Sequence, residues 1–204
     1  MQDIEQSMIK RIRGSGNGWC FTPIDFADLG GTAAVWTALH RLTQRGIIRR
    51  LAQGLYDFPR TDAELGTLSP DPDSVAQAFA RSRGIRIQPA GAYAANLLGL
   101  SEQVPARIVF LTDGTPRRIR FRNQEIVLRR TTPRNMTTAG RISGTVIQAL
   151  RYIGKGRITA AHRQTLQRRL SAAEKQQLLK DRLIAPGWMR RLLEEISGEG
   201  QPHA

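Results

Sequence analysis

The chain has 204 residues, a formal net charge of +14 and a sequence pI near 11.4. A charge this far from balance favours a polyanionic partner over an uncharged one. No apolar run approaches the roughly 20 residues of a membrane span, the N-terminus lacks a signal-peptide pattern, and a single cysteine excludes an internal disulfide and a multi-cysteine zinc site. We therefore expect a cytoplasmic protein that does not bind membranes.

The first thirty residues predict two helices separated by a short extended segment. Apolar residues at helical spacing predict a helix over residues 3–13, which the glycine-rich segment 14–18 ends. After the extended segment, Thr22 is suited to cap a brief helix over residues 23–29. Two consecutive glycines then break this second helix and allow a sharp turn of the chain.

A third helix and a hairpin come next. Thr32 caps a helix that runs to about Gln44, and Gly46 suits the left-handed position after its end. Two short strands joined by a turn at residues 52–54 complete this region. Helix, short helix, helix and hairpin is the order of a winged helix-turn-helix, which we assign to residues 1–62 as a DNA-binding domain.

The third helix has the pattern of a helix that contacts DNA bases. Val35, Leu39 and Leu42 form its inward stripe. In winged helix-turn-helix domains this helix enters the major groove, while the hairpin, or wing, lies along the backbone. The residues that we assign to DNA contact are Thr32, Ala33, Trp36, Thr37, His40, Arg41 and Gln44 on the helix and Arg49, Arg50 and Gln53 on the wing.

Alternatives remain for these helix residues. Arg41 is suited to a bidentate guanine contact, worth about 1–3 kcal/mol of discrimination. For each residue taken singly, a solvated helix face is the other interpretation. An outward Trp36 also fits packing on a neighbouring domain or on a second copy of the chain.

Residues 61–72 are polar and contain prolines, as in a linker, and residues 73–197 form the predicted second domain. Its expected elements are helices over 73–83, 90–100, 143–153, 159–170 and 186–196, a helix opened by the capping box of Ser171 and Glu174, and strands over 84–89, 106–114, 117–121 and 125–130. The fold class is therefore α+β: an N-terminal winged helix-turn-helix, then a mixed α/β domain with a basic β-hairpin and C-terminal helices.

The segment that contains the predicted hairpin carries half of the net charge. Nine arginines stand against two acids between Arg107 and Arg141. Apolar and basic residues alternate along both strands, so one face is apolar and the other displays arginines. The arginines assigned to DNA phosphates are Arg117, Arg118, Arg120, Arg122, Arg129 and Arg130. A solvated face is the alternative, and the two acids, Asp113 and Glu125, are expected to balance local charge rather than to hold a nuclease metal.

The sequence holds no recognisable pattern of catalytic residues. His40, His162 and His203 lie far apart and lack the spacing of metal ligands, and "YIGKGRI" lacks the full phosphate-loop pattern. No nucleophile elbow occurs, and Cys20, between Trp19 and Phe21, fits a buried apolar position better than a nucleophile. We expect a protein that is not an enzyme and that needs no metal or cofactor.

Several longer motifs resemble the DUF6088 family of bacterial proteins, which is similar to the AbiEi antitoxins of type IV toxin-antitoxin systems. They are "GWCFTPIDFADLGGTAAVWTALHRLTQRGIIRRLAQGLYDFPR", "LSPDPDSVAQAFAR", "GAYAANLLGLSEQVPARIVFLTDG", "TTPRNM" and "APGWMRRLLEEI". The resemblance covers residues 8–197. The chain departs from the pattern at Gln53, where a basic residue is expected at the tip of the wing.

The resemblance implies an autorepressing antitoxin. Its N-terminal domain would bind inverted repeats of double-stranded DNA in its own promoter, as a homodimer or cooperatively, and its C-terminal domain would add DNA affinity and carry the antitoxic function. The cognate toxin of such systems is a nucleotidyltransferase, and antagonism need not involve stable contact. Two other hypotheses are an interaction protein whose basic C-terminal domain binds a toxin or RNA without operator recognition, and an enzyme acting on nucleic acid.

Overall fold

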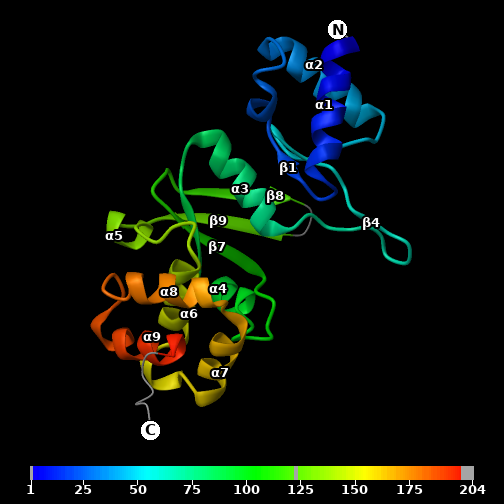
Figure 1. The fold of residues 1–204 in the computed structure, drawn as a ribbon. Coiled ribbons are helices and arrows are strands. Elements are labelled where there is room, and N and C mark those ends of the chain that lie inside the picture. Colours follow the sequence, from blue (N-terminus) through cyan, green and yellow to red (C-terminus); the bar gives the residue numbers. More distant parts are fainter. Residues whose placement is uncertain (1, 122–123, 199–204) are drawn as a thin grey trace. The chain divides into compact units, whose positions relative to one another are not determined.

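The chain adopts an α+β fold with several small sheets in a computed structural model that describes residues 2–121 and 124–198 (Figure 1). It divides into two compact units. Among the described residues, the first unit holds 2–85 and 119–121, and the second holds 86–118 and 124–198. The helix expected to open the second domain therefore belongs to the first unit, and the division falls later in the chain than the predicted linker.

The first unit combines helices with two small sheets. Its elements are α1 (Gln2–Ser15), β1 (Cys20–Phe21), the 3-10 helix η1 (Pro23–Phe26), α2 (Thr32–Gln44), β2 (Arg49–Ala52), β3 (Leu55–Asp57), β4 (Thr61–Asp62), β5 (Gly66–Thr67) and α3 (Pro72–Arg83). An antiparallel sheet has the order β1-β3-β2, and β4 pairs with β5. The helices predicted over 3–13 and 32–44 and the hairpin are confirmed, whereas the helix predicted over 23–29 is a 3-10 helix that ends at Phe26. The pairing of β1 with β3 and the small sheet in the expected linker were not predicted.

Helix ends in the first unit follow local chemistry. Asp25 accepts a hydrogen bond from the Thr22 backbone N–H at 2.7 Å, which fixes the start of η1. Gly31, rather than Thr32, is the N-cap of α2, so the prediction of a threonine cap there was wrong. Gly46 has a φ of +69°, the left-handed conformation expected after the helix end.

The core of the first unit joins α1, η1, α2 and the sheet. Phe21 lies at its centre, with ring centroids 5.4 Å from Phe26 in an edge-on arrangement and 6.1 Å from Tyr56. The buried residues are Met8, Ile12, Phe21, Phe26, Val35, Ala38, Leu39, Leu42, Ile48 and Tyr56. Three helical segments are thus held to one aromatic cluster, which fixes the direction of α2.

The second unit places helices against a sheet. Its elements are β6 (Ile87–Ala90), α4 (Gly91–Leu97), β7 (Arg107–Thr112), β8 (Arg117–Phe121, whose last three residues count with the first unit), β9 (Gln124–Arg130), α5 (Pro133–Met136), α6 (Ile142–Ile153), the 3-10 helix η2 (Lys155–Arg157), α7 (Ala160–Arg169), α8 (Ala172–Asp181), the 3-10 helix η3 (Gly187–Met189) and α9 (Arg190–Ser197). Helices α4 and α6 contact β6, and α7 to α9 form the helical end beyond them (Figure 1).

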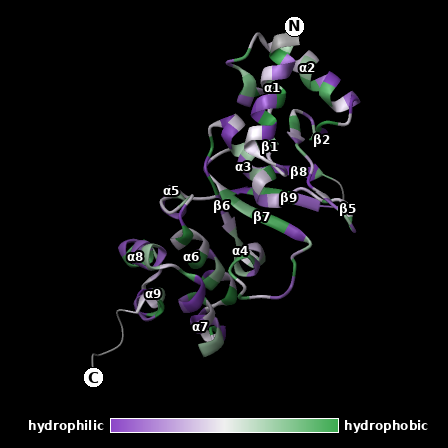
Figure 2. Ribbon diagram, turned by 45° about the vertical axis from the view of Figure 1, so that its right-hand side comes forward, coloured by the Kyte–Doolittle hydropathy of each residue, from purple (hydrophilic) through white to green (hydrophobic). Residues whose placement is uncertain are grey.

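The sheet of the second unit has the order β6-β7-β9-β8. β6 runs antiparallel to β7, whereas β7 runs parallel to β9, with Phe110 opposite Leu128. Figure 2 shows hydrophobic residues concentrated along β7 and hydrophilic residues along much of α7. The apolar strands therefore lie in the middle of the sheet. None of the helices in the described part of the chain is both long and apolar enough for a membrane crossing.

Candidate nucleic-acid interface

Helix α2 separates its buried and exposed residues as the sequence predicts. Val35, Leu39 and Leu42 are buried, together with Ala38. The seven residues assigned to the outer face are all exposed: Thr32, Ala33, Trp36, Thr37, His40, Arg41 and Gln44. Their accessibility is confirmed, and their contact with DNA stays a prediction.

Trp36 lies on the wing side of this face. Gly54 forms the turn between β2 and β3 with a φ of +69°, and a side-chain carbon at that position would lie 3.6 Å from the Cη2 atom of Trp36. Trp36 is 40% exposed. The wing turn therefore lies beside Trp36, so neighbours within its own unit account for part of this side chain's environment.

Arg41 lies on the opposite side of the face, toward α1. It borders a hollow of about 500 Å³ lined by Glu5, Gln6 and Ile9 of α1 and by Arg41 and Arg45 of α2. Arg45 forms an ion pair with Glu5 across this hollow. Because Trp36 and Arg41 occupy the two flanks, the middle of the face consists of Ala33, Thr37, His40 and Gln44.

The middle of this face offers hydrogen-bonding groups without a fixed charge. The Thr37 hydroxyl donates to the Ala33 carbonyl oxygen at 2.9 Å, so its proton is used within the helix while its oxygen still has acceptor capacity. His40 and Gln44 each present both a donor and an acceptor. Such groups suit reading of base edges, which carry mixed donor and acceptor patterns.

Arg49, predicted as a wing contact, is instead held by the buried Asp57 within the first unit. Its Nε donates to Asp57 Oδ1 at 3.0 Å and its Nη2 to Asp57 Oδ2 at 2.5 Å, and Nη2 also donates to the Leu68 carbonyl at 3.1 Å. The Asp57 side chain is 1% exposed and that of Arg49 is 18% exposed. The correction follows from the pairing of Arg49 directly opposite Asp57 in the sheet, which leaves Arg50 and Gln53 as the exposed wing residues.

Ion pairs also fix the segment between α1 and α2. The Arg11 guanidinium contacts both Asp28 oxygens, at 2.7 and 2.6 Å, and donates to the Asp25 carbonyl at 2.6 Å. This hydrogen-bonded pairing with Arg11 lowers the pKa of Asp28 to about 2. Arg81 of α3 donates to the Cys20 carbonyl at 3.0 Å. The turn before α2 is therefore tied to α1.

The strands of the second sheet alternate as predicted. Ile119, Phe121, Ile126 and Leu128 are buried. The exposed arginines are Arg117, Arg118, Arg120, Arg129 and Arg130. The remaining predicted contact, Arg122, lies outside the described residues. One apolar and one basic face are thus confirmed for the part of these strands that the structure describes.

The two acids of this region reduce its charge locally. Glu125 forms ion pairs with Arg107 at 3.4 Å and with Arg118 at 3.6 Å, and Asp113 pairs with Arg86 at 2.8 Å. The pKa of Asp113 is lowered, mainly by its hydrogen bond from the Arg86 side chain. Within the described ranges, Arg129 and Arg130 have no ion pair, so the uncompensated charge shifts to the end of β9.

Sequence reasoning missed two further arginines beside this end of β9. Arg134 lies in α5, and Arg151 reaches the same place from α6, where it donates to Asn135 Oδ1 at 2.7 Å. No local pattern relates positions 134 and 151, since the turn between α5 and α6 brings them together. The only sequence signal was the motif "TTPRNM", which contains Arg134 and Asn135.

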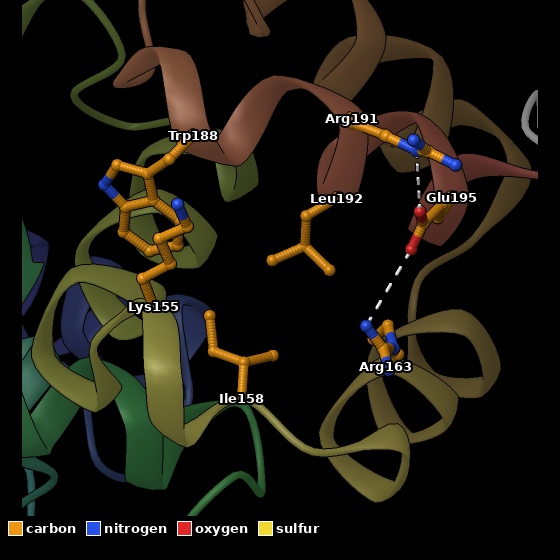
Figure 3. Close-up of a pocket in the computed structure, with 7 residues that line it drawn as sticks. All are labelled: Lys155, Ile158, Arg163, Trp188, Arg191, Leu192 and Glu195. Atoms are coloured by element: carbon orange, nitrogen blue, oxygen red, sulfur yellow. Dashed lines mark ion pairs between the residues drawn. The ribbon is translucent and has the colours of Figure 1, made fainter.

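A small hollow lies at the helical end of the second unit (Figure 3). It is lined by Lys155, Ile158, Arg163, Trp188, Arg191, Leu192 and Glu195. Figure 3 shows Glu195 between Arg191 and Arg163, with ion-pair distances of 3.4 and 3.9 Å. The volume of the hollow, about 200 Å³, is below the roughly 300–1,000 Å³ of small-molecule sites. The hollow therefore does not suit a substrate of ordinary size.

Cys20 is buried, as predicted. It is 1% exposed, and burial is the main cause that raises the pKa of its thiol to about 12. A thiol in this state is a poor nucleophile because the thiolate is the reactive form. Among the described residues, no group of three or more His, Cys, Asp or Glu side chains is placed to hold a metal ion.

Comparison with known proteins identifies the family. No curated protein matches the chain. The solved structure of the RV2827C protein from Mycobacterium tuberculosis is similar to it, with 16% sequence identity and a TM-score of 0.40 over 94% of this chain and 78% of that one. The model of DUF6088, described as a family of unknown function, matches residues 6–178. This chain belongs to the DUF6088 family.

Proposed function

We propose that this protein is a DNA-binding transcriptional regulator whose first unit is a winged helix-turn-helix. The order α1, η1, α2, β2 and β3, with β1 as the third strand of the sheet, fits that motif. The observation that carries the proposal is the outer face of α2, where seven predicted contact residues are exposed together and the central ones have no fixed charge.

In this proposal the two units have different tasks. The middle of the α2 face, with Thr37 and His40, contacts base edges in the major groove. Arg50 and Gln53 of the wing lie along the backbone. Arg129 and Arg130 at the end of β9, which have no ion pair among the described residues, add affinity that does not depend on sequence.

The biological role that we propose is autorepression by an antitoxin. The proposal rests on the resemblance of the chain's motifs to AbiEi antitoxins of type IV systems. It implies inverted repeats in the protein's own promoter as the operator, bound by a homodimer or cooperatively, and a nucleotidyltransferase-like toxin as the functional partner. A nucleotidyltransferase gene beside this one, with loss of toxicity on co-expression, tests this role.

DNA footprinting and gel shifts on the protein's own promoter test the proposed function. We expect Thr37→Val and His40→Ala each to reduce the preference for operator over random duplex by about 5- to 100-fold, the effect of losing one base contact. Gln176→Ala, an exposed neutral change on α8, is the matched control. Unchanged preference in both α2 variants would contradict the proposal. Co-purification of an acidic protein or RNA, without operator protection, would favour the interaction-protein alternative.

A further inference from the structure

Two arginines of the second unit stand without a carboxylate partner. Arg134 lies in α5 and Arg151 near the end of α6, and neither has an ion pair within residues 2–121 and 124–198. Other arginines of the same unit are paired: Arg86 with Asp113 at 2.8 Å and Arg141 with Asp181 at 2.8 Å. The positive charge of Arg134 and Arg151 is therefore not balanced by the protein around it.

Neutral hydrogen bonds hold Arg151 in place. Its Nη1 donates to Asn135 Oδ1 at 2.7 Å, and Asn135 Nδ2 in turn donates to the Thr131 hydroxyl at 2.8 Å. The Asn135 backbone N–H donates to the Thr132 carbonyl at 3.0 Å, which fixes the asparagine itself. Arg151 has five N–H donors, of which this bond uses one, so the guanidinium is oriented but still has donors for a ligand.

Asn135 brings the two arginines together, because Arg134 precedes it in the chain and Arg151 donates to its Oδ1 at 2.7 Å. Partial burial, followed by the charge of Arg134, lowers the pKa of Arg151. Keeping like charges adjacent costs folding free energy, and an anion bound between them would offset that cost. Arg129 and Arg130, exposed at the end of β9, extend the positive charge along the chain just before Thr131.

We infer that Arg134 and Arg151, positioned by Asn135 and Thr131, form a binding site for a phosphate group. The planar guanidinium fork matches phosphate oxygens, and two such groups supply four or more donors to one phosphate. Because the charge continues through Arg129 and Arg130, a row of phosphates fits better than a single one, and the structure favours a nucleic-acid backbone as the source. In that form the inference rests on the proposed function, since it adds a backbone contact to a DNA-binding protein.

Salt-dependent binding to a random-sequence DNA duplex tests the site in the full chain. We expect Arg134→Gln and Arg151→Gln each to reduce the slope of log K against log salt by about 0.9, the value for one lost phosphate contact. The control is Arg168→Gln, which removes an equal charge from an exposed arginine of α7 that has no ion pair among the described residues. Slopes unchanged in both site variants, or lowered equally by Arg168→Gln, would overturn the inference.

Two further variants separate a binding role from a folding role. Arg151→Lys keeps the charge but loses the fork, so we expect weaker binding with a preserved slope and an unchanged circular-dichroism spectrum. Asn135→Ala removes only the bond that orients Arg151, and we expect an intermediate loss of affinity. Binding by Arg151→Lys and Asn135→Ala at the wild-type level would show that charge alone acts and would overturn a built site.

NMR of the arginine Nε–H groups identifies the source of the phosphate. Titration with duplex DNA is expected to shift the Arg151 signal at lower concentration than titration with inorganic phosphate or a nucleoside triphosphate. A tighter response to the free triphosphate would identify a nucleotide site instead and overturn the backbone assignment. These site variants leave the operator preference unchanged, whereas Thr37→Val and His40→Ala change it at a constant slope. Failure of the site and failure of the proposed function therefore give different results.

Discussion

Arg11 and Arg49 of the first unit have a different environment from four arginines of the second unit, Arg129, Arg130, Arg134 and Arg151. In the first unit, Arg11 pairs with Asp28 and Arg49 pairs with the buried Asp57. At the end of β9 and beyond, Arg129, Arg130, Arg134 and Arg151 have no such partner in the described part of the chain. The comparison shows that net charge alone does not locate a polyanion-binding surface. The pairing of each arginine is more informative, because a carboxylate partner already compensates its charge.

Removing the buried Asp57 carboxylate should give the largest effect and tests this comparison most directly. Asp57→Ala leaves the Arg49 charge uncompensated between β2 and β3, and we expect the free energy of unfolding of the first unit to fall by about 3 kcal/mol. Urea denaturation followed by tryptophan fluorescence measures it. Arg50→Ala on the same strand, where the side chain is exposed, should stay within about 0.5 kcal/mol of wild type. A loss below about 1 kcal/mol for Asp57→Ala would mean that Arg49 is not structural.

Loss of Arg129 and Arg130 should have the opposite effect, weakening DNA binding while leaving stability almost unchanged. Arg129→Gln combined with Arg130→Gln removes two exposed charges without breaking an ion pair, so stability should change by less than about 0.5 kcal/mol. Binding to any duplex should weaken by about tenfold, and the salt slope should fall by about 1.8, the value for two lost phosphate contacts. Fluorescence anisotropy at several salt concentrations measures both quantities. A stability loss without a change in slope would assign these arginines to the fold.

The sequence was informative where a local pattern decides the outcome. The stripe of α2, the alternation in β8 and β9, and the capping box of α8 were predictable, and the Ser171 backbone N–H does donate to Glu174 at 2.8 Å. Each depends on residues a few positions apart along one element.

Contacts between distant positions were not predictable. The parallel pairing of β7 with β9 depends on which strand occupies the middle of the sheet, and two adjacent strands with a basic face do not reveal that. The Arg49–Asp57 pair depends on the burial of Asp57, and Arg151 meets Asn135 only through the turn between α5 and α6. Charge counts therefore identified a basic region but not which of its arginines are available for a ligand.

Variants of two neighbouring residues of α2 would test whether the middle and the flank of its outer face contribute differently to DNA binding. His40 lies in the middle of the outer face, whereas Arg41 lies beside the hollow toward α1. We expect His40→Ala to reduce operator preference more than Arg41→Ala does, by about 1 kcal/mol or fivefold, because a base contact is lost only from the middle of the face. Arg41→Ala should mainly lower the salt slope. Gel shifts with operator and random duplex compare them, and a larger loss of preference in Arg41→Ala would restore it as the guanine-reading residue.

The Arg11–Asp28 pair gives the smallest effect, because both side chains are partly exposed. The pKa of Asp28 determines how the effect depends on pH: in the folded chain, Arg11 lowers it from an ordinary 3.8 to about 2. The stabilisation by this ion pair is therefore complete above pH 3.8 and is lost as the pH falls toward 2. We expect the urea midpoint of Asp28→Asn to lie slightly below that of wild type at pH 6 and the two midpoints to converge as the pH approaches 2. A difference that persists or grows in acid would show that Asp28 stabilises the turn by something other than its charge.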